Sequence, residues 1–114
     1  MKDCIFCKII NREIPTKIIF EDERILAFED INPKAPVHIL IIPKEHFASL
    51  NELPEEKRDI LGYILLKARK IAQEKGIGKK GYRIVLNTAE DSGQEVFHLH
   101  FHLLGGRRMT WPPG

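Results

Sequence analysis

The 114-residue sequence contains no apolar run that approaches the roughly 18 residues of a membrane-spanning helix. It also lacks an excess of either charge, because 18 Lys and Arg against 16 Asp and Glu leave a formal net charge of +2. Domains that bind nucleic acid usually carry a clear basic excess. The composition therefore indicates neither a membrane protein nor a nucleic-acid-binding protein.

Cysteine is scarce as well, with only Cys4 and Cys7. The first residues show no charged start, apolar stretch and cleavage site of a secretory leader, so we expect a cytoplasmic location. In a reducing compartment such cysteines are more often metal ligands, redox groups or free thiols than a disulfide. Repeats and Gly-rich phosphate loops are absent. The remaining expectation is one domain over residues 1–114 with one modest core.

The hydrophobic pattern predicts two helices and five strands. A long helix is expected over 54–75, where apolar residues recur at intervals of three and four; Pro54 would be its first residue and Gly76 would follow its end. Helices and strands are segregated along the chain, which predicts an α+β fold with an antiparallel sheet. The short helix is expected over 4–11 and the strands over 18–21, 25–28, 37–42, 82–87 and 96–104.

Three of the five histidines, His98, His100 and His102, alternate with apolar residues in the last predicted strand. Because side chains alternate between the two faces of a strand, the three imidazoles would share one face. The apolar residues between them could then pack on the long helix. Imidazole serves as nucleophile, proton carrier or metal ligand. This pattern leaves three interpretations open: phosphate chemistry, a zinc site, and a polar sheet face without chemistry.

The two cysteines lie in Cys4-Ile5-Phe6-Cys7, which has the spacing of one half of a tetrahedral zinc site. Two more ligands would be needed. The alternative is a pair of free thiols buried on a short amphipathic helix. A thioredoxin-like redox pair is disfavoured, because no βαβ pattern surrounds these residues.

Residues 98–104 read His-Leu-His-Phe-His-Leu-Leu, and here the chain resembles the histidine triad (HIT) family, whose signature is His-φ-His-φ-His-φ-φ with φ apolar. The ends Gly105-Gly106-Arg107 and Trp111-Pro112-Pro113-Gly114 resemble the branch of histidine triad nucleotide-binding proteins. The resemblance covers nearly the whole chain. Further segments that resemble the family are Phe20-Glu21-Asp22, Phe28-Glu29-Asp30-Ile31, Pro36-Val37-His38, Ile42-Pro43-Lys44, Asn87 and Gly93-Gln94.

The resemblance implies a HIT fold, with a five-stranded antiparallel sheet, one long helix and one short helix. It also implies a homodimer, in which the sheet continues across two subunits. The implied activity is hydrolysis of the P–N bond of purine nucleoside phosphoramidates, of the adenosine 5′-phosphoramidate type, through a nucleotidyl-histidine intermediate. Two alternatives stay open: a dinucleoside polyphosphate hydrolase of the same family, and a nucleotide-binding scaffold protein whose hydrolysis is incidental.

The same resemblance implies roles for the histidines. His100 would be the nucleophile, and His102 and His38 would contact the phosphate and support proton transfer. No metal is required for this catalysis if imidazoles and backbone amides carry the developing charge. Chains with both Cys-x-x-Cys and Pro-Lys-x-His elements resemble Cys2His2 zinc proteins. This implies a closed, structural zinc site that pins the N-terminal helix to the sheet, with the ligands Cys4, Cys7, His46 and His98.

Nucleotide-binding residues follow from the resemblance too. Asp30 would accept the ribose hydroxyls, and Asn87 would bind substrate near the phosphate. The segment Gly93-Gln94-Glu95 would offer backbone N–H groups to the phosphate. Trp111 would reach the active site of the partner subunit. The base pocket would be lined by apolar side chains, namely Phe6, Ile9, Ile14, Phe28 and Ile31.

Glu95 departs from some members of this branch, which carry a serine there. A hydroxyl could donate a hydrogen bond to the phosphate or the leaving amine, whereas a carboxylate cannot unless it is protonated. We therefore expect Glu95 to bias the choice of leaving group.

Overall fold

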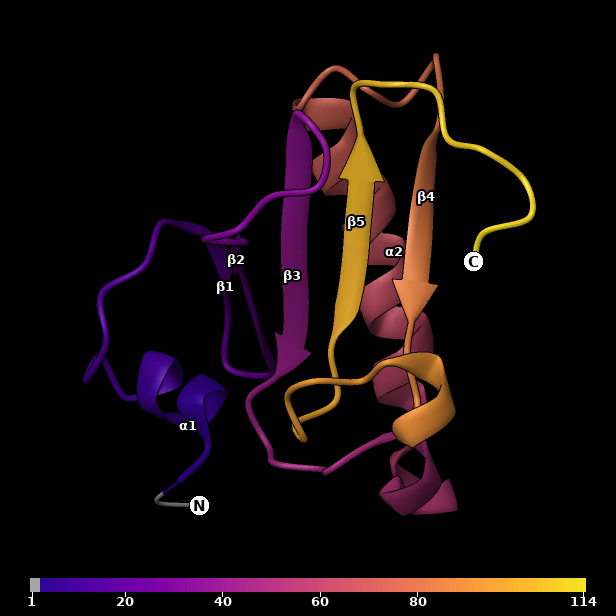
Figure 1. Cartoon of the computed structure of the whole chain (residues 1–114). Helices are drawn as coiled ribbons and strands as arrows, with labels where there is room; N and C mark the ends of the chain where they lie inside the picture. The colour runs from indigo at the N-terminus through magenta and orange to yellow at the C-terminus, as the bar shows by residue number, and fades with distance from the viewer. Residues whose placement is uncertain (1–2) are drawn as a thin grey trace.

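Five strands form one antiparallel sheet in the computed structural model, which describes residues 3–114 (Figure 1). The strand order across the sheet is β1-β2-β3-β5-β4. The predicted α+β fold, with one long and one short helix, is therefore confirmed. The helices are α1 (Ile5–Ile10) and α2 (Asp59–Glu74), and the strands are β1 (Ile18–Glu21), β2 (Ile25–Glu29), β3 (Val37–Pro43), β4 (Tyr82–Leu86) and β5 (Phe101–Gly105).

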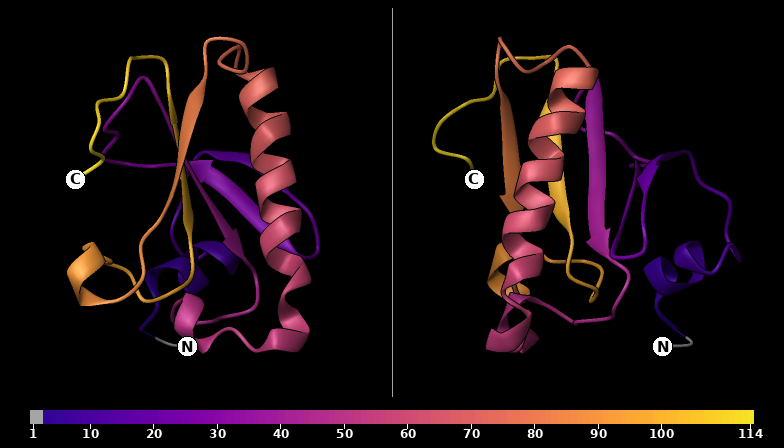
Figure 2. Two further views of the ribbon diagram at one scale, coloured as in Figure 1. Left: turned by 90° about the vertical axis from the view of Figure 1, so that its right-hand side faces the viewer. Right: turned by 180° about the vertical axis from the view of Figure 1, so that it is seen from behind.

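The long helix α2 covers one face of the sheet, as the edge-on view in Figure 2 shows. Its buried side chains pack on residues of β2, β3 and β5. Among the β5 residues are Phe101 and Leu103, which alternate with the histidines as the sequence pattern predicts. Neither helix in the described part of the chain has the length and hydropathy of a membrane span. The α2 residues in this core are Ile60, Ile64, Ala68, Ile71 and Ala72.

The short helix α1 packs on the opposite face. Its Phe6 and Ile9 form a second apolar cluster with side chains that alternate with those facing α2. Because β2 and β3 are covered on both faces, their sequences are almost continuous apolar runs rather than alternating ones. The strand residues in this second cluster are Leu26, Phe28, Leu40 and Ile42.

The predicted start of the long helix at Pro54 is wrong, because α2 begins at Asp59 and residues Glu55–Lys57 form a separate 3-10 turn. These residues are charged and exposed, and the first side chain that the sheet buries is Ile60. Packing of an apolar face supplies most of the stability of a helix, so the regular helix begins where that packing begins.

The end of the helix matches the prediction. Gly76 follows the cap in the left-handed region, with φ 76°. The N–H of Gly76 donates to the carbonyl of Gln73, and the N–H of Ile77 donates to the carbonyl of Ala72. These two bonds form a Schellman motif, for which glycine is the favoured residue.

The last predicted strand is also wrong at its start, because β5 begins at Phe101 rather than at residue 96. The neighbouring strand β3 ends at Pro43, which has no N–H to donate. The carbonyl of Pro43 accepts from the His98 side chain, and the N–H of Leu99 donates to Phe47 instead. Of the three alternating histidines, only His102 therefore lies in the regular strand.

Candidate functional site

Three imidazoles and one carboxylate meet where β3 and β5 pair. Nε2 of His38 lies 2.9 Å from Nδ1 of His102 and 3.4 Å from Oδ2 of Asp30. The ring centre of His100 lies 5.0 Å from that of His102. The structure thus brings together the three predicted catalytic histidines and Asp30, although they come from three separate segments of the chain.

Backbone partners determine which nitrogen carries the proton in two of these rings. Nδ1 of His38 accepts a hydrogen bond from the N–H of Lys34 at 3.0 Å, so the neutral ring carries its proton on Nε2. That Nε2–H donates to Nδ1 of His102, which in turn leaves the proton of His102 on its own Nε2. The backbone amide of Lys34 thus determines the tautomers of both His38 and His102.

His100 has the opposite tautomer. Its Nδ1 donates to the backbone carbonyl of His98 at 2.8 Å, so the lone pair remains on Nε2. Burial lowers the pKa of His100, and burial together with neighbouring His100 and His38 lowers the pKa of His102 to about 4. Burial also lowers the pKa of His38. All three rings are therefore neutral at pH 7, and His100 holds an unprotonated nitrogen.

A cavity of about 380 Å³ opens beside this cluster. The predicted site residues that line it are Asp30, His38, Asn87, Glu95 and His102. Sequence reasoning missed three basic residues in its wall, Lys34, Arg83 and Arg107. Arg83 lies four residues before Asn87, which directly follows β4, so the period of the strand places both on one face and could have identified Arg83.

The C-terminal tail runs along the same cavity and is tied to it by two hydrogen bonds. Arg83 donates to the carbonyl of Thr110 at 2.9 Å, and Arg107 donates to the carbonyl of Lys34 at 3.1 Å. The side chain of Trp111 is 81% exposed, and its predicted contact with a partner subunit stays a prediction.

The segment that follows β4 is held by the buried side chain of Gln94. The Gln94 amide donates to the carbonyls of Ala48 and Val96, and its oxygen accepts from the N–H of Ala89 at 2.8 Å. Gly93 adopts the left-handed region with φ 84°. The side chain of Gln94 is thus a structural anchor. The N–H groups of Gly93 and Gln94 donate to the carbonyls of Glu90 and Ala89, which leaves the predicted backbone contact with phosphate to Glu95.

The predicted base-pocket residues divide into two groups. Phe6, Ile9 and Phe28 are buried, and the ring of Phe6 meets the ring of His100 edge-on, with centres 5.1 Å apart. Ile14 is half-buried against the same cluster. In contrast, Ile31 is 98% exposed beside Asp30.

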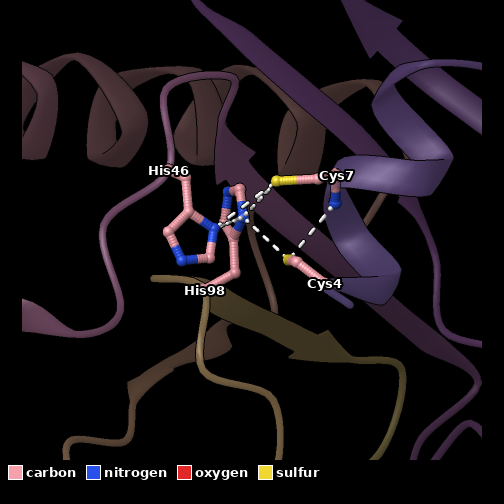
Figure 3. Close-up of side chains that lie close together, drawn as sticks. All are labelled: Cys4, Cys7, His46 and His98. Carbon is pink, nitrogen blue, oxygen red and sulfur yellow. Dashed lines mark hydrogen bonds between the residues drawn. The ribbon is translucent and has the colours of Figure 1, made fainter. Parts of the chain in front are cut away.

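A second cluster contains the two cysteines, as Figure 3 shows. Nδ1 of His98 lies 3.3 Å from Sγ of Cys4 and 3.6 Å from Sγ of Cys7. Nδ1 of His46 lies 3.4 Å from Sγ of Cys7 and 3.1 Å from Nδ1 of His98. The four residues come from α1 and its N-cap, from the segment after β3 and from the segment before β5.

These four donor atoms fit a zinc ion. Ligand atoms of a tetrahedral Cys2His2 site lie roughly 3.3–3.8 Å apart, given the usual zinc bond lengths. Nε2 of His98 donates to the carbonyl of Pro43 at 2.8 Å, so its Nδ1 presents a lone pair to the sulfurs. Burial lowers the pKa of His98 to about 4 and lowers that of His46, which keeps both rings neutral.

The two sulfurs also favour a bound cation. Burial and the adjacent Cys4 raise the pKa of the Cys7 thiol to about 11, so this thiol stays protonated at neutral pH when no cation is bound. Two neighbouring thiolates would form only with a cation between them. A soft divalent ion such as zinc is the natural partner of this donor set.

Comparisons with known proteins identify the family of this chain. A match to the HIT domain covers residues 11–109. An uncharacterised HIT-like protein of Synechocystis sp. is 51% identical over 113 residues, which are 99% of this chain and 98% of that protein. A 14 kDa zinc-binding protein of Zea mays is 51% identical over 112 residues, which are 96% of this chain and 87% of that protein.

The fold has a close counterpart among crystal structures. A HIT family hydrolase from Legionella pneumophila Philadelphia 1 superposes with a TM-score of 0.95 at 54% identity, covering 98% of this chain and 100% of that chain. Since the domain match, the histidine cluster and the fold agree, the chain belongs to the HIT domain family.

Proposed function

We propose that this protein binds purine nucleotides and hydrolyses the P–N bond of nucleoside phosphoramidates such as adenosine 5′-phosphoramidate. The observation that carries the proposal is the neutral His100 ring, whose Nδ1–H is bound to a carbonyl and whose Nε2 is free to attack phosphorus. Membership of the HIT domain family and similarity to a protein described as a HIT family hydrolase support a hydrolytic role.

In the first step, Nε2 of His100 forms a bond to the α-phosphorus. The P–N bond breaks, and the leaving nitrogen, which is already protonated in the zwitterionic phosphoramidate, takes the electron pair and departs as a neutral amine. His102 is the adjacent ring, and its Nε2–H, the free donor of the cluster, would donate a hydrogen bond to a phosphate oxygen. The product of this step is a nucleotidyl-histidine, which replaces one difficult displacement by two easier ones.

In the second step, water attacks the phosphorus and Nε2 of His100 leaves with its electron pair. The proton that the water loses passes to solvent, because Nε2 of His102 is already protonated and its Nδ1 accepts from His38. His38 holds His102 in the required tautomer through its Nε2–H, and the N–H of Lys34 holds His38 in turn. A nucleoside monophosphate is released, and the three rings return to their starting tautomers.

The sugar and phosphate would be held at the cavity wall. The Asp30 carboxylate accepts from the N–H of Asn32 at 2.8 Å, which orients it at the cavity for the ribose hydroxyls. Asn87 and the backbone N–H of Glu95 would contact the phosphate, because the N–H groups of Gly93 and Gln94 donate to the carbonyls of Glu90 and Ala89. Phe6, Phe28 and the exposed Ile31 would contact the base.

Zinc would be held by Cys4, Cys7, His46 and His98, and it would supply a crosslink between α1 and the segments that flank β3 and β5. We further propose a homodimer in which the sheet continues across two subunits. The outer strands β1 and β4 each present one unpaired edge to which a second sheet could add. Sedimentation of the purified protein tests this assembly.

One observation favours a second candidate, a dinucleoside polyphosphate hydrolase. Lys34, Arg83 and Arg107 line the cavity and could hold additional phosphate groups. Both candidates would use His100 in the same way and would differ only in the leaving group.

The test is a comparison of turnover on adenosine 5′-phosphoramidate and on diadenosine polyphosphates, for the wild type and for His100→Asn. We expect faster wild-type turnover of the phosphoramidate and a loss of at least about a thousandfold in the variant. A preference for the polyphosphate would select the second candidate. Undiminished turnover by the variant would refute His100 as nucleophile, and binding without turnover would favour a scaffold role.

A further inference from the structure

We propose that the Cys2His2 cluster is a positioning device for the nucleophile: a bound cation holds His100 in its tautomer and orientation through His98 and through Phe6. The inference rests on the proposed function for the role of His100. Two independent contacts lead from the cysteine cluster to the catalytic ring, and both pass through residues that are almost completely buried.

The first contact passes through the residue His98. Its side chain is fully buried and faces the two sulfurs with Nδ1, while its Nε2–H donates to the carbonyl of Pro43. The backbone carbonyl of this same residue accepts the Nδ1–H of His100 at 2.8 Å. A cation bound to His98 therefore holds the residue whose carbonyl selects the nucleophilic tautomer of His100.

This contact matters because His100 lies outside the regular sheet. β5 begins at Phe101, so no strand ladder holds the backbone of residues 98–100. The N–H of Leu99 donates to the carbonyl of Phe47, which directly follows the second imidazole of the cluster, His46. The two segments joined by this hydrogen bond therefore each contain a residue that would hold the cation, His46 in one and His98 in the other.

The second contact passes through Phe6, which stands between the two cysteines on α1. Its ring centre lies 5.1 Å from that of His100, with the planes at 85°, and 5.9 Å from that of His98. A helix of six residues such as α1 does not form on its own in water. Crosslinking Cys4 and Cys7 to the histidines would press Phe6 against the catalytic ring.

Loss of the cation should therefore loosen two supports of His100 while leaving the core under α2 intact, because that core contains no residue of α1. The expected consequence is a mixture of His100 tautomers. Only the tautomer with an unprotonated Nε2 can attack phosphorus, and small misplacements of reacting groups are costly. Turnover should fall much more than nucleotide affinity.

The experiment uses the full chain labelled with 15N-histidine, observed by NMR at pH 7.5 in three states: zinc-loaded, stripped with a chelator, and reloaded with Zn²⁺. We expect one Nδ1–H tautomer of His100 in both loaded states and mixed tautomers in the stripped state. Stripping should lower kcat about tenfold while the Kd for AMP changes by less than about threefold. Identical His100 signals and equal kcat in all states would overturn the proposal.

Two variants, each with a matched control, test the same role without a chelator. His46→Ala removes a ligand outside the catalytic cluster and should reproduce the stripped state, whereas Glu45→Ala, its exposed neighbour, should behave as the wild type. If stripping unfolds the chain, Phe6→Leu should keep its zinc and lower kcat about tenfold, with exposed Ile5→Ala as the matched control on α1. An unchanged kcat in Phe6→Leu would then refute the proposal.

The two proposals can fail separately. If wild-type protein turns over no phosphoramidate but its His100 tautomer still depends on zinc, the positioning role stands and the proposed reaction is wrong. If turnover depends on His100 but neither turnover nor tautomer depends on zinc, the proposed function stands and the positioning role is wrong.

Discussion

The Nε2–H of His38 donates to Nδ1 of His102 at 2.9 Å, across two neighbouring strands. The direction of this hydrogen bond follows from the N–H of Lys34, which occupies the other nitrogen of His38. His102 is thereby left with a proton on the nitrogen that is free to serve a substrate. The orientation of this pair of rings therefore depends on the backbone amide of Lys34.

Activity should persist to unusually low pH for a histidine enzyme. Burial lowers the pKa of His100, with Asp30 opposing the shift. Burial, together with neighbouring His100 and His38, lowers the pKa of His102 to about 4. Protonation would remove the lone pair of His100, so kcat/KM should fall only as the pH drops through these lowered values. A pH profile between 4 and 8, with circular dichroism as the control for folding, tests this. An acid limb centred near 6.5, the ordinary imidazole value, would contradict it.

Metal removal should lower the melting temperature. We expect about one zinc per chain and a loss of about 3 kcal/mol when a tightly bound ion is withdrawn, which corresponds to roughly 10–20 °C for a chain of this size. Metal analysis of untagged protein and thermal melts with and without chelator measure both. Less than about 0.2 zinc per chain, together with an unchanged melting temperature, would show that the cluster holds no metal.

Gln94→Leu should destabilise the protein by about 2–4 kcal/mol, because it leaves the Ala89 N–H and two carbonyls without their partner. Urea unfolding gives the value. Ser92→Ala, which removes one exposed hydrogen bond from the same segment, should cost less than about 0.5 kcal/mol. Similar costs for the two variants would show that Gln94 is not the anchor.

Ala89→Gly should stabilise the fold by about 1 kcal/mol. Ala89 has φ 67° and ψ −170°, a conformation that is essentially restricted to glycine. The reverse change in the same segment, Gly93→Ala, places its methyl group in open space at φ 84°, so its cost is conformational, about 1 kcal/mol. Opposite shifts in the urea midpoint are expected, and shifts of the same sign would contradict the backbone argument.

Glu95→Ser should change the leaving-group preference. Glu95 lines the cavity with His102, so its carboxylate would favour a cationic leaving group over an anionic one. We expect the ratio of lysyl to fluoride turnover to drop by about fivefold in the variant, since a charge pair at an exposed residue is worth up to about 1 kcal/mol. Ratios that match the wild type across amine, lysyl and fluoride substrates would dismiss the idea.

Local sequence patterns predicted much of the fold. The three-and-four period placed Ile64, Ala68 and Ile71 against the sheet, and the alternation at residues 98–104 placed Phe101 and Leu103 in the core. The boundaries of the elements were less predictable. Pro54 is a favourable first residue of a helix, yet α2 begins at Asp59, next to the first residue that the sheet buries. Local propensity is weak where packing decides.

The sequence by itself determined the residue types, the faces on which they stand and the resemblance that suggested their roles. Tertiary structure alone decided which nitrogen of each imidazole is free, because the deciding partners are the amide of Lys34 and the carbonyls of Pro43 and His98. It also brought Cys4 within 3.3 Å of His98, at the opposite end of the sequence. Hydrogen-bond direction and ligand convergence depend on atoms that become neighbours only after the chain has folded, so no local pattern can encode them.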